Sequence, residues 1–309
     1  MSTYRRKAAG PNMAYAIGID LGATNIKTLA VGPDGRILIE RTAPTEDGPD
    51  RKWAATIRDT VAAIEGKMGG AAEHVGLCAP GLIHADEHAV SWMVDRMVGT
   101  IDFDWRAYLK RPAKVPVLND GHAALYGEVW LGAAQGMRNV VALTLGTGVG
   151  GAVMIDGRLL KGHIGRAGQL GHIGVDANSS PDLCNMPGGL DDLIGNATVA
   201  RRSQGRFQDT ADLVEAYETG DAAARDLWLK TMHLLACGIA SLVNTVDPQA
   251  VVIGGGMIQA GASLFGPLNE AMARVEWRPH GYSVPILPAR LGAHAGAMGA
   301  AGYAMGVTF

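Results

Sequence analysis

The sequence is poor in cysteine, in excess charge of one sign and in long apolar runs. Only three cysteines occur among 309 residues, and none forms a CxxC pair. We therefore expect no disulfide framework and a reducing, cytoplasmic location. The formal net charge of −3 and the pI of about 6.3 predict no basic surface for nucleic acid. No uninterrupted apolar stretch reaches the roughly 18 residues of a membrane-spanning helix, so no membrane span is expected.

The N-terminal residues lack the apolar run of a signal peptide. Three basic residues, Arg5, Arg6 and Lys7, are followed by Ala-Ala-Gly-Pro-Asn. We expect residues 1–14 to form a disordered extension before the first strand. The hydrophobic share of 48% is ample for one large or two medium-sized cores.

Glycine, by contrast, is abundant, with 43 residues, and it gathers where apolar strands are expected to end. The three clearest segments are "DLGATNIK" (20–27), "LGTGVGG" (145–151) and "IGGGM" (253–257). Backbone N–H groups of such loops bind phosphate oxygens, and threonine adds a hydroxyl. None matches the P-loop or a complete GxGxxG fingerprint. Each alone is more typical of a structural turn, but three in one chain favour phosphate binding.

The hydrophobic periodicity predicts a strand meander followed by helices and further strands, and this pattern occurs twice. In the first half we expect strands at 15–20, 26–31, 36–42, 74–78 and 115–119, and helices at 53–68 and 123–131. In the second half we expect strands at 139–144, 152–155, 158–161 and 284–288, and helices within 195–246 and at 294–305. Residues 250–257 are expected to be a buried strand that leads into glycines and then a helix. The repetition indicates an α/β fold of two related halves that face one cleft.

Two polar segments lie between the glycine-rich loops. "VPVLNDGHAAL" (115–125) places Asn119 and Asp120 where a strand gives way to a helix. An aspartate there is commonly a helix N-cap, and alternatively it is a general base at the mouth of the cleft. "GRAGQLGHIGVD" (165–176) carries Gln169 and His172 between spaced glycines. This loop fits recognition of sugar hydroxyls, and it fits a solvated surface loop equally well.

Together, five segments resemble the ROK family of sugar kinases, which has the actin-like ATPase (ribonuclease H-like) fold of hexokinases. The matching segments are "IGIDLGATNIKTLAV", "VPVLNDGHAALYGE", "VVALTLGTGVGGAVMIDGRLLKG", "GRAGQLGHIGVD" and "DPQAVVIGGGM". The resemblance implies two α/β domains with mixed sheets and an interdomain cleft for ATP and sugar. It implies a small domain at 15–120, a large domain at 121–294, and a C-terminal helix at 295–309 that packs back on the small domain.

The resemblance also implies a role for each matching residue. Asp120 corresponds to the catalytic aspartate, a general base that takes the proton of the attacking sugar hydroxyl. Asn119 would hydrogen-bond a neighbouring sugar hydroxyl, and Asp20 would orient Mg²⁺ through water. The expected ATP- and phosphate-binding positions are Gly22, Thr24, Asn25, Lys27, Thr147, Gly148, Gly255 and Gly256. We therefore expect ATP and Mg²⁺ as cofactors.

The sugar loop departs from the family pattern at one position. Gln169 stands where the family usually has glutamate, and an amide donates hydrogen bonds as well as accepting them. His172 and Asp191 complete the expected sugar-binding set. Asp191 corresponds to a longer glutamate in the family. These differences leave the identity of the sugar open.

The family's zinc site is also incomplete. The family uses the loop histidine and three cysteines, whereas this chain retains Cys184 and has Asp182 and Gly189 at the other two positions. Structural zinc nearly always takes four protein ligands, so no structural zinc is expected. Whether His172, Asp182 and Cys184 bind any metal stays open.

The function implied by the resemblance is ATP-dependent phosphorylation of a hexose, with the 6-hydroxyl of glucose as the leading acceptor. The alternatives are an amino sugar such as N-acetylmannosamine, or mannose, fructose or allose, and polyphosphate in place of ATP. A sugar-responsive transcription regulator is not expected, because too few residues precede the first strand for a DNA-binding domain. Family members are commonly dimers, so we expect a homodimer, and the apolar helix at 227–246 would be either its interface or core.

Overall fold

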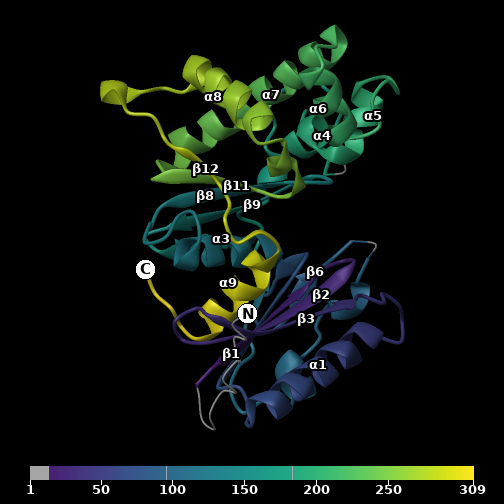
Figure 1. Cartoon of the computed structure of the whole chain (residues 1–309), viewed down its shortest axis with the longest axis vertical. Coiled ribbons are helices and arrows are strands. Elements are labelled where there is room, and N and C mark those ends of the chain that lie inside the picture. The colour runs from purple at the N-terminus through teal and green to yellow at the C-terminus, as the bar shows by residue number, and fades with distance from the viewer. Residues whose placement is uncertain (1–13, 95, 183) are drawn as a thin grey trace, which may run out of the picture. The chain divides into compact units, whose positions relative to one another are not determined.

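The computed structural model describes residues 14–309 except residues 95 and 183. The predicted N-terminal extension therefore lies, apart from Ala14, outside the described residues. The chain forms two compact units. Of the described residues, the first unit includes those up to Gly127 together with Ala293–Thr308, and the second includes Glu128–Gly292 with Phe309 (Figure 1).

The first unit is built on a five-stranded mixed sheet. Its strands are β1 (Ala16–Leu21), β2 (Asn25–Val31), β3 (Ile37–Pro44), β4 (His74–Ala79) and β7 (Val117–Asn119), in the order β3-β2-β1-β4-β7. The first three form the predicted antiparallel meander, whereas β4 and β7 are parallel to β1. Because side chains alternate along a strand, Ile17 and Ile19 both point into the hydrophobic core of this unit.

Two helices cover the opposite faces of this sheet (Figure 1). Helix α1 (Lys52–Met68) buries Ile57, Val61 and Ile64 in the core. Helix α9 (Ala295–Ala304), rich in glycine and alanine, packs against β1 and β4. This approach requires glycine in the sheet, because a Cβ atom at Gly76 would lie 2.1 Å from the carbonyl oxygen of Ala300.

A small subsidiary region of this unit was not predicted. It contains a two-stranded sheet of β5 (Leu82–Ile83) and β6 (Val90–Trp92), the 3₁₀ helix η1 (Val98–Thr100) and helix α2 (Trp105–Tyr108). These elements are too short to give a clear periodicity. Helix α3 (Asp120–Leu131) follows β7 and begins at Asp120, three residues before the expected start. The boundary between the two compact units falls within α3, after Gly127.

The second unit repeats the sheet topology of the first. Its strands are β8 (Val140–Leu145), β9 (Val149–Ile155), β10 (Arg158–Leu159), β11 (Ala250–Gly254) and β12 (Ile286–Pro288), in the order β10-β9-β8-β11-β12. Again the first three strands are an antiparallel meander, and the last two are parallel to the first. The prediction of two related halves is therefore confirmed at the level of topology. Strand β9 begins earlier than expected, which leaves only residues 146–148 as the turn.

Several helices contribute buried side chains to the hydrophobic core of the second unit. They are α4 (Leu190–Ile194), α5 (Val199–Arg202), α6 (Thr210–Glu218), α7 (Ala222–Val246) and α8 (Ala262–Val275). Short 3₁₀ helices are η2 (Leu170–His172), η3 (Asn196–Thr198), η4 (Gly256–Ala260), η5 (Pro279–Gly281) and η6 (Gly292–His294), the last spanning the unit boundary. Helices α7 and α8 lie side by side (Figure 1).

Helix α7 alone among the described residues is long and apolar enough to cross a membrane by length and composition. Half of its most apolar window is buried within the protein. Its side chains Trp228, Leu235 and Ile239 belong to the core of the second unit. The apolar character of this helix is therefore accounted for by packing against α4, α6 and α8.

Candidate functional site

Two carboxylates gather at the carboxyl ends of parallel strands in the first unit. Asp20 lies near the end of β1, and Asp120 follows β7 directly. The Cys78 thiol, on the neighbouring strand β4, donates a hydrogen bond to Oδ1 of Asp20 at 3.5 Å. Gly296 of α9 packs closely against the Asp20 carboxylate, because a Cβ at this position would lie 2.9 Å from Oδ2 of Asp20. The fold thus holds an acidic side chain in a tight pocket of protein atoms.

The pKa values of both carboxyl groups are raised, and the charge of Asp120 contributes to the shift of Asp20. Burial first, and the neighbouring charge of Asp120 second, raise the pKa of Asp20 to about 6. Desolvation also raises the pKa of Asp120, partly offset by hydrogen bonds from Gly121 and Asn119. Although the Asp120 side chain is open to solvent, protein atoms surround it closely enough to disfavour its charge. A divalent cation that prefers oxygen ligands, such as Mg²⁺, would offset the negative charge of these carboxylates.

The turn after β1 carries the other candidates of the first unit. The N–H of Gly22 donates to the Asn25 carbonyl at 3.1 Å, which closes the turn and leaves Thr24 and Asn25 exposed. Lys27 is paired across the strands with Asp20, and its Nζ donates to the Ala293 carbonyl at 3.2 Å. The turn therefore presents polar atoms beside the carboxylate, and its phosphate-binding role stays a prediction.

Asn119 links Asp120 to the chain after β4. Its Nδ2 donates to the carbonyl of Gly81 at 3.1 Å, and its Oδ1 accepts from the N–H of Gly121 at 3.0 Å. The same N–H also donates to Oδ1 of Asp120 at 2.8 Å. Asn119 is buried, so this structure gives it a positioning role for Asp120. The predicted contact of Asn119 with a sugar hydroxyl stays a prediction.

The second unit has its own glycine turn, residues 146–148 between β8 and β9. Asp191 of α4 supports it, since its Oδ1 accepts from the N–H of Val149 at 2.6 Å. A Cβ atom at Gly148 would lie 2.1 Å from the same oxygen, so glycine is required there. One oxygen of Asp191, predicted to bind sugar, is thus already used to position the turn.

A cavity of about 500 Å³ opens beside this turn. Among the predicted nucleotide-binding residues, Thr147 and Gly256 line it. Gly255 lies next to it in a left-handed conformation (φ 87°), where a Cβ would lie 2.2 Å from the Leu145 carbonyl oxygen. The remaining lining residues are Gly146, Asn196, Asp209, Thr210, Ala211, Val214, Glu215, Glu218, Met257, Gln259 and Ala260.

Sequence reasoning missed the contribution of helix α6 to this cavity. Thr210 opens the helix, and its N–H donates to Oδ1 of Asn196 at 2.7 Å. Among the described residues, its buried hydroxyl has no hydrogen-bond partner, which is costly unless a ligand or water supplies one. Asp209 caps α6 through the N–H of Asp212 at 2.9 Å. An N-cap aspartate before an apolar run signals a helix, but only the fold shows that it lines a cavity.

The loop at 165–176 contains the 3₁₀ helix η2. Gln169 precedes η2 and is partly buried. Both nitrogens of the His172 ring have neighbours: Nδ1 lies 3.0 Å from Oδ2 of Asp182, and Nε2 lies 3.5 Å from Sγ of Cys184. The ligand atoms of His172, Asp182 and Cys184 all lie within 4.8 Å of one another. The reduced set that the sequence left open is therefore brought together, and its side chains come from one short stretch of chain.

Comparisons with known proteins identify a family and several similar proteins and structures. Residues 16–306 match the ROK family. The glucokinase of Thermotoga maritima is 34% identical over 289 residues, which is 82% of this chain and 86% of that protein. The ROK hexokinase of Thermus thermophilus has a TM-score of 0.83 at 32% identity, covering 94% of this chain and 98% of the other. A ROK glucokinase from Streptomyces griseus, in complex with glucose and AMPPNP, has a TM-score of 0.72 at 27% identity, covering 95% and 100%.

These matches extend over nearly the whole described chain. Each sheet has a meander with two parallel strands added to it. The chain as a whole is similar in structure to a ROK hexokinase and a ROK glucokinase. The predicted fold class, an α/β actin-like ATPase fold with mixed sheets, is therefore confirmed. The family match over residues 16–306 and the 34% identity to the Thermotoga maritima glucokinase show that the chain belongs to the ROK family.

Proposed function

We propose that this protein is an ATP-dependent sugar kinase that phosphorylates the 6-hydroxyl of glucose. The observation that carries the proposal is the placement of Asp120 at the start of α3, directly after β7 and electrostatically coupled to Asp20. A carboxylate in this position accepts the proton of a sugar hydroxyl and orients its oxygen for in-line attack on a phosphoryl group. Its raised pKa makes Asp120 a stronger proton acceptor than a solvated aspartate.

Asp20 is the residue best suited to hold Mg²⁺, directly or through water. The raised pKa of Asp20, caused by burial and by Asp120, marks a place where negative charge is poorly compensated. Bound there, Mg²⁺ would neutralise charge on the phosphate oxygens. The Cys78 thiol and Gly296 hold the carboxylate in one orientation. Lys27, paired with Asp20 across the strands, adds a positive charge near the turn.

The cavity of the second unit is proposed to bind the nucleoside part of ATP. Its volume of about 500 Å³ falls within the usual range of small-molecule sites, about 300–1,000 Å³. Val214 and Met257 give it apolar walls, and Thr210 offers a buried hydroxyl without a protein partner among the described residues. The backbone of the turn at 146–148 would meet the phosphates, as the glycine pattern predicts.

Gln169 supports a second candidate acceptor, an amino sugar such as N-acetylmannosamine. Glucose presents only hydroxyls and a ring oxygen, whereas an N-acetyl group adds an amide carbonyl that accepts hydrogen bonds. The Gln169 amide can donate to such a carbonyl, which a carboxylate cannot do. A panel of sugars compared by kcat/KM decides between the two. Glucose as the best substrate supports the first assignment, and a higher kcat/KM for N-acetylmannosamine supports the second.

The kinase proposal is tested with Asp120→Asn. We expect kcat to fall on the order of 10²- to 10⁴-fold, because an amide cannot accept the proton. Binding of a fluorescent ATP analogue and the melting temperature should change little, since Asn keeps the size of the side chain. Asp59→Asn, which removes an exposed carboxylate paired with Arg58, is the matched control. Near-normal turnover of Asp120→Asn would refute Asp120 as the base.

A further inference from the structure

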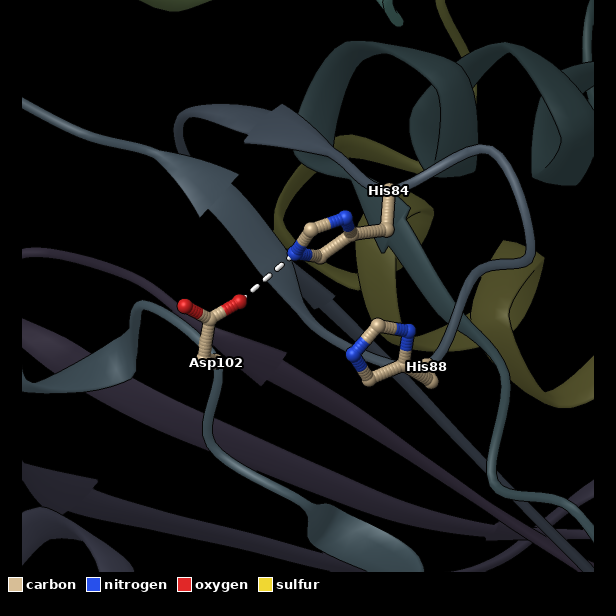
Figure 2. A group of neighbouring side chains, drawn as sticks. All are labelled: His84, His88 and Asp102. Atoms are coloured by element: carbon tan, nitrogen blue, oxygen red, sulfur yellow. Dashed lines mark hydrogen bonds and ion pairs between the residues drawn. The ribbon is translucent and has the colours of Figure 1, made fainter.

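A cluster of two histidines and one aspartate lies in the first unit and plays no part in the proposed kinase chemistry. His84 and His88 lie in the turn between β5 and β6, and Asp102 follows η1. One ligand atom from each of the three residues lies within 4.8 Å of the others. Figure 2 shows a ring nitrogen of each histidine facing the Asp102 carboxylate. We propose that His84, His88 and Asp102 bind a divalent transition-metal cation of the zinc type.

Backbone hydrogen bonds hold the three residues in place. The N–H of His84 donates to the carbonyl of Ala89 at 3.1 Å, and the carbonyl of His84 accepts from the N–H of Glu87 at 2.8 Å. The N–H of Asp102 donates to the carbonyl of Val90 at 2.9 Å. Main-chain hydrogen bonding therefore holds Asp102 next to the segment that carries His84 and His88. A cation there would need only side-chain adjustments.

The side-chain contacts resemble those of a metal site whose cation is replaced by a proton. Nε2 of His84 lies 2.7 Å from Oδ1 of Asp102, and the two imidazole rings stack with centroids 4.5 Å apart and an interplanar angle of 24°. A cation would take the place of the proton between Nε2 of His84 and the carboxylate. The ring of His88 is close enough to supply the second nitrogen.

Asp86 supplies the outer hydrogen bond that metal-binding histidines usually have. Its Oδ1 lies 2.6 Å from Nδ1 of His88. With Nδ1–H donated to Asp86, Nε2 of His88 keeps its lone pair for a cation. A carboxylate in this position fixes the tautomer and raises the basicity of the ligand.

The donor set selects the class of cation. Two imidazole nitrogens and one carboxylate oxygen suit Zn²⁺ and neighbouring transition metals, whereas Mg²⁺ prefers oxygen ligands alone. Three protein ligands leave a position for water, as in open zinc sites. The side chains are 35% exposed at His84, 44% at His88 and 69% at Asp102. The site is therefore accessible from solvent, and its metal should exchange readily with chelators.

The location of the cluster gives the metal a structural consequence. Gly81, immediately before β5, accepts the hydrogen bond from Nδ2 of Asn119. The cation would link the β5–β6 turn to Asp102. It would thereby stabilise the segment that begins at Gly81, whose carbonyl accepts the hydrogen bond from Asn119. Metal binding should raise the melting temperature, because a ligand that binds only the folded state stabilises it.

The test uses tag-free full-length protein, stripped with EDTA and dialysed, and Zn²⁺ alone as the probe. Calorimetric titration should show binding that weakens at least tenfold in His84→Ala, in His88→Ala and in Asp102→Asn. Asp86→Asn should weaken it about tenfold through the lost outer hydrogen bond. His74→Ala, which alters a half-exposed histidine of the same unit outside the cluster, is the matched control and should bind as the parent does.

A second arm separates this cluster from His172, Asp182 and Cys184. Cys184→Ser should retain the proposed binding event, and Co²⁺ bound to that variant should give the visible spectrum of a nitrogen–oxygen site without a thiolate charge-transfer band. Circular dichroism checks that each variant folds, which is expected because the altered side chains are at the surface. Zn²⁺ binding that is unchanged in His84→Ala and His88→Ala, that is lost only in Cys184→Ser, or that cannot be detected would overturn the proposal.

Discussion

The two units share one strand order but differ in chemistry at equivalent positions. Asp20 in β1 and Thr144 in β8 occupy the same place, each followed by a leucine and a glycine. Their partners on the next parallel strand are Cys78 and Gly254. The first unit therefore places a poorly compensated carboxylate at its turn, whereas the second places a hydroxyl and a glycine. A duplicated frame thus supports charge chemistry in one copy and close backbone approach in the other.

The largest effect that separates the two copies should come from Asp20→Asn. Removing this carboxylate should lower kcat on the order of 100-fold, because the charge that positions a cation is lost. Thr144→Val, at the equivalent position, should change kcat by about threefold or less. Steady-state kinetics at saturating ATP and sugar measure both. Equal losses in the two variants would show that the copies perform the same task.

The next effect concerns stability and sharpens the comparison of the two sheets. Gly76 of β4 corresponds in strand register to the buried Val252 of β11. On the first sheet, the glycine-rich helix α9 packs closely against β4 at Gly76. Gly76→Ala should destabilise the protein by about 2–3 kcal/mol, since its Cβ would meet the Ala300 carbonyl oxygen at 2.1 Å. Urea unfolding measures the change.

The control for this variant is Gly66→Ala in α1. A Cβ at Gly66 would meet nothing within 4 Å, and alanine favours a helix interior over glycine by about 1 kcal/mol. The control should therefore be neutral or stabilising. A Gly76→Ala protein as stable as the parent would mean that α9 can shift away from β4 without loss.

The duplicated frame was largely predictable from the sequence, because each meander has a local apolar pattern that ends in glycine. The two sheets and the long helices α1, α7 and α9 begin and end close to their expected positions. The short elements β5, β6 and α2 were missed, since their conformation depends on contacts with distant segments. For the same reason, nothing local could indicate that Thr210 lines the cavity or that Asp102 meets His84.

The glycine turns themselves provide a smaller contrast. Gly148→Ala should raise the KM for ATP about tenfold, because its Cβ would displace Asp191 from the N–H of Val149 and shift the turn. Gly22→Ala should raise it only about threefold, since the nearest atom, the Asn25 carbonyl oxygen, lies 3.0 Å from the added Cβ. KM values measured at saturating sugar test this order. The reverse order would locate the main phosphate contacts in the first unit.

The smallest effect concerns pH and depends on the carboxylate that only the first unit has. The pKa of Asp20 is raised from 3.8 to about 6 in the folded state, so the folded protein binds this proton more tightly than the unfolded chain does. Its contribution to stability is therefore full below about pH 4 and is lost as the pH rises towards 6. Asp20→Asn has no such proton. Relative to this variant, the parent should lose on the order of 1 kcal/mol across that window, since solvent and ions screen part of the shift.

Urea unfolding of parent and variant at pH 4, 5, 6 and 7, without nucleotide or divalent cations, measures this difference. Adding Mg²⁺ at pH 7 should return part of the lost stability to the parent and none to Asp20→Asn, because the cation favours the ionised carboxylate. If the free energy of unfolding of parent and variant changed in parallel across the four pH values, the raised pKa of Asp20 would be contradicted. Asp20 would then be as well accommodated as Thr144, and the electrostatic difference between the two copies would have to lie at Asp120 instead.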